Sequence, residues 1–405
     1  MNRRHFLAAS VAAGFAPAFG QDAGRPGKKL LLVSSWQVEN IGDIAHTPGM
    51  LALLEKHRPA DSVTLWPKRV SPEVVKMLEA RFPQLTIAQT EAEQEAALQE
   101  CDFVIHGSGP GMVGHRVLRK ARAAGKPYGF FGITLSDEEL TNEAGRTLLA
   151  NAEYVFNRDT DSLKAFRQAG IEGPKSDFGP DATFAVDLRD DKAADRLLAK
   201  YGLEAGGYLC AVPRLRRTPY WEIRPQESKP NPRFIEENRK FAEIDHAKVR
   251  AGISAWVRET GMKVFLVPEM TYQTALLKPL LFDPLPDDVK PSVAMIDRYW
   301  LTDEAASVYA KAAAIVSIEQ HSPILAIAAG VPAVHLRQPT DSRKGQMWRD
   351  IGLNDWLFEI DDTAGEQVAR KLVEIGKDLP AARTIAAKAR QFAHERMAAM
   401  VQAIG

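Results

Sequence analysis

Short apolar runs alternate along most of the chain with longer segments of helical periodicity. The runs are continuous rather than alternating in polarity, which is typical of parallel strands buried on both faces of a sheet. Helical segments such as 114–124 and 303–313 separate them. The pattern predicts an α/β protein with two doubly wound, Rossmann-like sheets. The first series of runs lies at residues 30–34, 63–66, 103–106, 128–132 and 154–157, and the second at 208–212, 264–267, 314–317 and 333–336.

The two series also predict the domain organisation, since a chain of 405 residues is too long for one hydrophobic core. We place an N-terminal Rossmann-like domain at residues 28–188 and a C-terminal one at 189–362, because a charged helical segment and a Gly-Gly pair separate the two series. Residues 363–405 have helical periodicity and are expected to pack on the domains. Two such domains facing a cleft, closed by C-terminal helices, resemble the fold of the B-type glycosyltransferases.

Residues 1–20 have the pattern of an export signal. Arg3 and Arg4 precede an apolar run over residues 8–19, and small residues lie just before Gln21. The run is shorter than the roughly 20 residues that a membrane helix needs. Paired arginines in this position are typical of twin-arginine signal peptides. We therefore expect the twin-arginine export machinery to carry the protein to the periplasm or the cell exterior, and the mature chain not to span a membrane.

Charge and cysteine content argue against several classes of protein. The chain has 52 basic and 52 acidic residues, so no global field favours nucleic acid or anionic lipid. Cys101 and Cys210 lie in different predicted domains, which favours two buried free thiols over a disulfide. Because no Cys-x-x-Cys spacing occurs, we predict no metal site, and we expect no cofactor.

The residues that follow the strands carry the candidate chemistry, because ligands of such sheets bind at the carboxyl ends of the strands. After the first strand come Asn40, Gly42 and Asp43, and then Thr47 and Pro48, which are expected to begin the next helix. The free amides of that helix start can bind a phosphate. An ordinary turn, in which Asp43 makes a local hydrogen bond, explains the same residues equally well.

A glycine-rich loop follows the third strand, and Gly109, Gly111 and Gly114 satisfy the spacing G-x-G-x-x-G within it. This spacing is typical of dinucleotide sites, yet it follows a later strand than usual, and Pro110 removes one amide. We favour a tight glycine turn that lines the cleft over nicotinamide or flavin binding.

Charged residues follow the later strands. Arg158 lies at a strand end before a helix, and Asp181 lies in a turn rich in helix-breaking residues. Arg214 opens a basic, proline-rich loop, which is either a cationic lid over an anionic substrate or a solvated insertion. Glu319 and His321 stand at a predicted helix start after a buried strand. An imidazole there can act as a general acid or base, or it can merely cap the helix.

In their order and spacing, these segments resemble the polysaccharide pyruvyl transferase family, from residue 30 to about residue 361. Members of that family have a glycosyltransferase-B-like fold and move an enolpyruvyl unit from phosphoenolpyruvate to a sugar, forming a pyruvate ketal. The resemblance implies an anionic donor such as phosphoenolpyruvate and a glycan acceptor of the cell envelope. It rests on Asn40-Ile41-Gly42-Asp43, the loop 107–114, Arg158-Asp159 with Ser162, Pro180-Asp181 with Phe184, Arg214, and His321 ahead of Gly330-Val331-Pro332.

The resemblance also implies roles for single residues. His321 would protonate the enol carbon or the leaving phosphate. Glu319, close to it in the sequence, is our second catalytic candidate, although the resemblance does not imply it. Arginines would neutralise the donor, because guanidinium groups pair well with phosphate and carboxylate. The substrate-binding residues expected on this basis are Asn40, Gly42, Asp43, Gly107, Ser108, Gly109, Arg158, Asp181, Arg214 and Arg217.

The chain departs from the family pattern at two places. Glu319 stands where the family usually has an arginine, and Pro268-Glu269-Met270-Thr271 replaces a strand end that carries a histidine in the family. A carboxylate about 5 Å from a phosphate costs roughly 3 kcal/mol at an effective dielectric constant near 20. Glu319 must therefore be protonated, paired or turned away from the donor.

Three functions remain open at this point. The first is a pyruvyl-transferase-type enzyme that modifies envelope glycans. The second is an exported, non-catalytic, glycan-binding descendant of the same fold, which Glu319 and the export signal favour, because phosphoenolpyruvate is a cytoplasmic metabolite. The third is a glycosyltransferase that uses another donor, such as a nucleotide sugar.

Replacing Arg3 and Arg4 together by lysine is expected to retain the protein in the cytoplasm, because twin-arginine export depends on the arginine pair. Cell fractionation and immunoblotting measure the effect, and the substitution Arg25→Lys, beyond the predicted cleavage site, serves as the control. Undiminished export of the double variant would refute the signal assignment.

Overall fold

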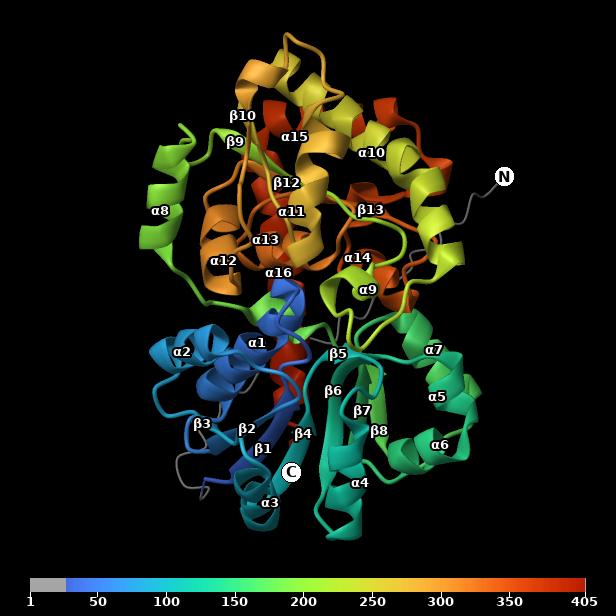
Figure 1. The fold of residues 1–405 in the computed structure, drawn as a ribbon. Helices are drawn as coiled ribbons and strands as arrows, with labels where there is room; N and C mark the ends of the chain where they lie inside the picture. The colour runs from blue at the N-terminus through green and yellow to red at the C-terminus, as the bar shows by residue number, and fades with distance from the viewer. Residues whose placement is uncertain (1–26, 405) are drawn as a thin grey trace, which may run out of the picture.

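The computed structural model describes residues 27–404, which form two parallel sheets with helices on both faces (Figure 1). The first sheet has the strand order β3-β2-β1-β4-β6-β7-β8, with β5 paired to β6, and the second has the order β11-β10-β9-β12-β13-β14. In both sheets the order reverses beside the first strand, as in doubly wound folds. The predicted α/β class with two Rossmann-like sheets is confirmed.

All nine predicted strands are present, together with the short strands β3, β5, β8, β11 and β14. The added strands have two to four residues, too few for an apolar pattern to be recognised. The first sheet consists of β1 (Lys29–Ser34), β2 (Ser62–Pro67), β3 (Thr86–Ile87), β4 (Phe103–His106), β5 (Gly109–Pro110), β6 (Tyr128–Thr134), β7 (Tyr154–Asn157) and β8 (Lys175–Phe178). The second consists of β9 (Tyr208–Val212), β10 (Lys263–Leu266), β11 (Val293–Met295), β12 (Ala314–Ser317), β13 (Ala333–Arg337) and β14 (Leu357–Glu359).

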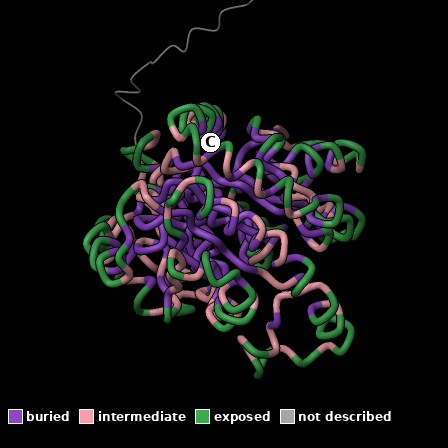
Figure 2. The backbone as a smooth tube through the Cα atoms, turned by 90° about the horizontal axis from the view of Figure 1, so that it is seen from above, coloured by how far each residue is buried: buried purple, intermediate pink, exposed green. Residues whose placement is uncertain are grey.

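The helices cover both faces of each sheet, so buried residues follow the strands while exposed residues gather on the outer helices and loops (Figure 2). The N-terminal half contains α1 (Ile41–His57), α2 (Pro72–Arg81), α3 (Glu91–Glu100), α4 (His115–Ala123), α5 (Asp137–Thr141), α6 (Glu143–Ala150) and α7 (Thr160–Gln168). The rest are α8 (Asp191–Lys200), α9 (Tyr220–Ile223), α10 (Pro232–Thr260), α11 (Thr274–Leu276), α12 (Thr302–Ala310), α13 (His321–Ala328), α14 (Met347–Asp350), α15 (Gly365–Lys377) and α16 (Leu379–Val401).

The start of α1 corrects the sequence-based prediction. The helix begins at Ile41 rather than near Thr47, and Pro48 lies inside it. Asn40 has an extended backbone, and its side-chain oxygen accepts the amide hydrogens of Gly42 (2.6 Å) and Asp43 (3.3 Å). Asparagine at this position is a strong N-cap, so the helix starts directly after the strand-end loop.

Helix α16 returns from the C-terminal half to pack on the N-terminal one, where it lies between the two sheets in Figure 1. Arg396 donates to the carbonyl of Phe178 (2.5 Å), and His394 Nε2 lies 3.1 Å from the carbonyl of Phe184. At the chain end, Arg58 donates to the carbonyl of Ile404 (2.5 Å). The last helix therefore ties the two halves together.

The other predictions concern the cysteines, membrane-spanning helices and the signal peptide. Cys101 and Cys210 are buried free thiols, as expected. None of the helices between residues 27 and 404 is long and apolar enough to cross a membrane. The predicted signal peptide at residues 1–20 lies outside the described residues.

The substitution Gly49→Ala is expected to destabilise the fold by about 1–3 kcal/mol, because a Cβ there would overlap the carbonyl group of Ala182. Backbone atoms cannot move aside as a flexible side chain does. Urea unfolding of the variant measures the loss. At Gly207 the nearest atom to an added Cβ is 3.4 Å away, so Gly207→Ala is the matched control and should unfold at the wild-type urea concentration.

Candidate functional site

The first turn of α1 is docked into the C-terminal half of the molecule. Asn40 forms an antiparallel bridge with Met270, and the amide of Ile41 donates to the carbonyl of Glu269 (3.1 Å). Thr302 Oγ1 donates to the carbonyl of Ile41 at 2.8 Å. These contacts bring the segment after β1 against the segments that follow β10 and β11. Ligands of parallel sheets bind at such carboxyl ends of the strands.

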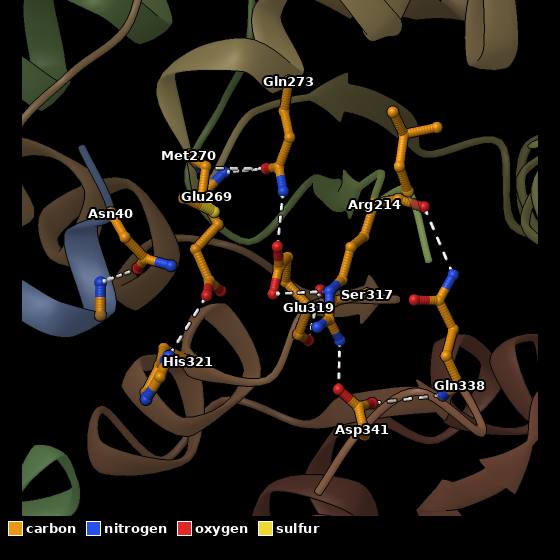
Figure 3. Close-up of polar contacts among 12 residues, drawn as sticks. Asn40, Arg214, Glu269, Met270, Gln273, Ser317, Glu319, His321, Gln338 and Asp341 are labelled. Atoms are coloured by element: carbon orange, nitrogen blue, oxygen red, sulfur yellow. Dashed lines mark hydrogen bonds and ion pairs between the residues drawn. The ribbon is translucent and has the colours of Figure 1, made fainter. Parts of the chain in front are cut away.

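His321 stands at the centre of this contact. It is the first residue of α13, directly after β12, and its Nδ1 lies 3.3 Å from Glu269 Oε1 (Figure 3). Glu269 also accepts the backbone amide (2.6 Å) and the hydroxyl (2.8 Å) of Ser322. On the other side, a Cβ at Gly42 would overlap the Cβ, Cγ and Nδ1 atoms of His321. Glycine is therefore required at position 42 for α1 to approach the imidazole.

A second group, from the N-terminal half, lies behind His321. His46 Nδ1 is 2.7 Å from Ser108 Oγ and 3.0 Å from Asp181 Oδ1. Arg158 Nη1 donates to Asp181 Oδ2 at 2.5 Å, and all of these side chains are buried. The pair Arg158–Asp181 thus holds one imidazole at the domain contact by a buried, charge-assisted network.

The rings of His46 and His321 meet edge to face, with their centroids 5.2 Å apart. The Nε2 atom of each ring is buried and has no hydrogen-bond partner among the described residues. A buried polar atom without a partner costs about 1–3 kcal/mol, and such atoms are concentrated at functional sites. Two imidazoles, one from each half of the molecule, therefore offer unused proton-accepting atoms at the domain contact.

These imidazoles and Asp181 lie close enough to hold a metal ion, since one possible ligand atom from each is within 4.8 Å of the others. The carboxylate of Asp181 does not fit that role. Its Oδ1 accepts from Ser108 Oγ (3.1 Å) and from both the amide (3.0 Å) and hydroxyl (2.9 Å) of Thr183, while Oδ2 accepts from Arg158 (2.5 Å). With its lone pairs engaged in this way, Asp181 serves as a hydrogen-bond acceptor.

Burial and neighbouring charges set the protonation states. Burial lowers the pKa of His321 to about 3, and the neighbouring His46 and Lys344 act in the same direction, so the imidazole of His321 is neutral at pH 7. Burial alone would raise the pKa of Asp181, but His46 and Arg158 hold it well below its usual value. The centre therefore combines a permanent carboxylate with a neutral imidazole.

A polar cluster from the C-terminal half surrounds Glu319 (Figure 3). Glu319 Oε1 accepts from Gln273 Nε2 at 2.7 Å, and Oε2 lies 3.4 Å from Arg214 Nε. The guanidinium of Arg214 also donates to Asp341. Burial raises the pKa of Glu319 to about 7, while Arg214 opposes this shift. The Glu319 carboxyl is thus paired with Gln273 and Arg214, which is one of the three arrangements that the sequence allowed.

The arginines expected to bind the donor are each paired with a carboxylate of the chain. The guanidinium of Arg158 neutralises Asp181, and that of Arg214 lies between two carboxylates rather than free in a cleft. Arg217 forms an ion pair with Glu237 (2.8 Å) and stacks on Phe234 of α10 (4.8 Å), so it contacts none of the His321 cluster. Each of these arginines is neutralised by a carboxylate of the same chain. The order of charges along the sequence does not reveal such pairs.

Side chains of the same chain pack against the glycine loop after β4. Trp36 Nε1 donates to the carbonyl of Ser108 (2.7 Å), and a Cβ at Gly109 would overlap the Trp36 ring. A Cβ added at Gly107 would lie only 3.1 Å from Ser34 Oγ, so this glycine is also closely packed. The glycines therefore allow the indole to approach, and the favoured interpretation of a tight turn agrees with this packing.

Most of the residues expected at the site do meet at the domain contact, namely Asn40, Gly42, Asp43, Ser108, Asp181, Glu319 and His321. The sequence-based reasoning missed His46, Glu269 and Lys344. His46 lies one turn beyond Gly42 on α1, so placing the helix start at Ile41 would have put it on the same face.

Replacing Asp181 by Asn is expected to lower the free energy of unfolding by about 3–5 kcal/mol at pH 7, because it leaves the buried guanidinium of Arg158 without a counter-charge. Asp181 has a folded pKa below the unfolded value, so its stabilisation is complete above pH 4 and is lost as the pH falls towards the folded pKa. Chemical denaturation between pH 3 and pH 7 measures both effects.

The matched control is Asp187→Asn, which breaks the exposed ion pair with Arg81. Exposed pairs contribute about 1 kcal/mol or less. Equal losses of stability in the two variants would contradict the assigned role of Asp181.

A search of functionally curated proteins finds no match. Among solved structures, the UDP-GlcNAc 2-epimerase of Neisseria meningitidis bound to UDP-GlcNAc is similar, with a TM-score of 0.59, 11% identity, and coverage of 93% of this chain and 99% of that one. The S. aureus MnaA–UDP structure has a TM-score of 0.57, 12% identity, and coverage of 93% and 96%.

Anabaena HepE in complex with UDP-glucose is also similar, with a TM-score of 0.54, 13% identity, and coverage of 92% of this chain and 97% of that one. At these identities the likeness concerns the fold, and it confirms the predicted glycosyltransferase-B-like architecture. The family model described as Polysaccharide pyruvyl transferase matches residues 40–338, a segment that begins at the N-cap of α1 and includes His46, Asp181 and His321. The chain therefore belongs to the polysaccharide pyruvyl transferase family.

Proposed function

We propose that this protein transfers the pyruvyl unit of an enol-phosphate donor such as phosphoenolpyruvate to a glycan of the cell envelope, where it forms a ketal. Family membership supports the reaction class. The observation that carries the proposal is the position of His321 between the two halves of the molecule, against Gly42 and Glu269 and beside His46. Ligands of parallel sheets bind at the carboxyl ends of the strands, and this imidazole lies at such an end in the contact between the two sheets.

The chemistry requires a group that moves a proton. A glycan hydroxyl adds to C2 of the donor, and a proton adds to C3, which converts the methylene into a methyl group. A second hydroxyl then displaces phosphate at C2 and completes the ketal, so that one donor and two hydroxyls give one ketal and one phosphate. Each hydroxyl loses a proton, one of which reaches C3 while the other leaves with the phosphate.

His321 is suited to the first addition. Burial keeps the ring neutral at pH 7, and the negative charge of a bound donor raises its basicity, so that the ring can accept the hydroxyl proton and pass it to C3 of the donor. Glu269 lies at Nδ1 and orients the ring, which leaves Nε2 as the atom that exchanges the proton. Approach of an anionic donor favours the protonated ring between the two transfers.

Glu319 is proposed as the second acid–base group. Its pKa of about 7, raised by burial, lets the carboxyl exchange a proton near neutral pH. Asp43, held by Gln37 at 2.5 Å, is proposed to contact the acceptor, since carboxylates are good acceptors for sugar hydroxyls. We also propose that the protein acts outside the cytoplasm, on the basis of Arg3, Arg4 and the apolar run that follows them.

A second candidate is a glycan-binding protein without catalysis. Arg158, Arg214 and Arg217 each form an ion pair with a carboxylate of the chain, which weakens the site for a highly charged donor. Turnover in the presence of phosphoenolpyruvate and an envelope glycan separates the two functions.

The substitution His321→Ala is expected to lower the rate of ketal formation by about 10²–10⁴-fold, because general acid–base catalysis contributes a factor of this size. Phosphate release and the methyl proton signal of the ketal measure the reaction. The control is His115→Ala, an exposed histidine at the start of α4. An unchanged rate in His321→Ala would remove this imidazole from the mechanism, and no turnover by the wild-type protein would favour the glycan-binding function.

A further inference from the structure

The arginines expected to bind the donor are already neutralised, which raises the question of what holds an anion at this site. Arg158 is paired with Asp181, and Arg214 is shared between Glu319 and Asp341. Arg216, next along the basic loop, is paired with Asp245 at 2.9 Å and also with Asp361. A donor could use these cations only by displacing buried carboxylates, which costs free energy.

Lys344 differs from these arginines. It lies in the short 3-10 helix Arg343–Gln346 after β13, and its Nζ is 4.0 Å from Asp341 Oδ1, beyond hydrogen-bond distance. Its side chain is 17% exposed, so the ammonium can still be reached from solvent. An ammonium that is partly exposed and held only in a loose ion pair, without a hydrogen bond, can bind an incoming anion without first breaking a hydrogen bond.

The charge of Lys344 acts on the centre of the site. Burial raises the pKa of Glu269 and of Glu319, and the Lys344 ammonium opposes the shift in both. The same ammonium adds to the effect of burial in lowering the pKa of His321. Lys344 is therefore close enough to interact with the proposed catalytic residues.

The backbone around Lys344 is held in place from both halves of the molecule. Gln320, the residue before His321, donates to the carbonyl of Lys344 at 2.8 Å. The neighbouring Arg343 reaches across to the N-terminal half, where it donates to the carbonyl of Leu135 (2.9 Å) and pairs with Asp137. The lysine is thus fixed beside the start of α13 and next to a segment that bridges the two domains.

We propose that Lys344 binds the anionic group of the donor, its phosphate or its carboxylate, beside His321. The inference rests on the proposed function and adds a residue to it, because Lys344 lies beyond the segment 40–338 that the family model matches. The positive charge of Lys344 also acts on Glu319, so it counteracts the repulsion between that carboxyl and a bound anion.

Titration calorimetry of the full-length protein with phosphoenolpyruvate, pyruvate and inorganic phosphate tests this inference. The substitution Lys344→Met is expected to weaken phosphoenolpyruvate binding by roughly tenfold to a hundredfold, the range for loss of a hydrogen bond to a charged group. Lys344→Arg should restore most of the affinity. Whichever of pyruvate and phosphate loses affinity in Lys344→Met identifies the group that the lysine holds.

The matched control is Lys371→Met on α15, which removes the same charge at a side chain of similar exposure (19%) that is paired with Glu374. It should bind phosphoenolpyruvate as the wild type does. Equal affinity of wild type and Lys344→Met would overturn the role of Lys344 while leaving the proposed transfer intact. If the folded wild type binds none of the three anions, the proposed donor and the inference both fail, whereas Lys344-dependent binding of phosphate or pyruvate alone contradicts only the donor.

Discussion

The close approach of α1 to α13 is the contact on which the candidate site depends. A helix start without a side chain at position 42 can lie directly on the imidazole of His321, and the amide of Ile41 then reaches the carbonyl of Glu269. Any larger residue would separate the two sheets at their carboxyl ends. Helix α16 contacts both α1 and α13, so it also stabilises this arrangement.

The negative charges within this contact are neutralised by individual ion pairs rather than by an excess of basic residues. The buried pair Arg158–Asp181 positions His46, while Arg214 is held by Glu319 and Asp341. Such networks are costly to bury unless every partner is present, so they define one geometry for the side chains. Few basic groups therefore remain to bind a donor, and for this reason Lys344 matters for the proposed donor binding.

The charge reversal at Glu319 has a structural explanation. The carboxylate that is out of place in the family pattern accepts a hydrogen bond from Gln273 and faces Arg214, so it is compensated within the C-terminal half. Its raised pKa follows from burial and links the protonation of the site to pH values near neutrality. The departure from the family pattern therefore changes the acid–base properties of the site while the fold is retained.

The local pattern of the chain determined the fold class, the strands of both sheets and the strand-end positions of Gly42, Asp181, Glu319 and His321, because continuous apolar runs and breaker residues act over short distances. It did not reveal the start of α1, since a cap is recognised by the hydrogen bonds of Asn40 and not by Pro48 alone. Only the tertiary structure decided which arginine pairs with which carboxylate. It also decided that His46 lies against His321. Arg158 and Asp181 are 23 positions apart and the other two pairs are more than a hundred apart, and the energies of all three depend on burial that no local pattern records.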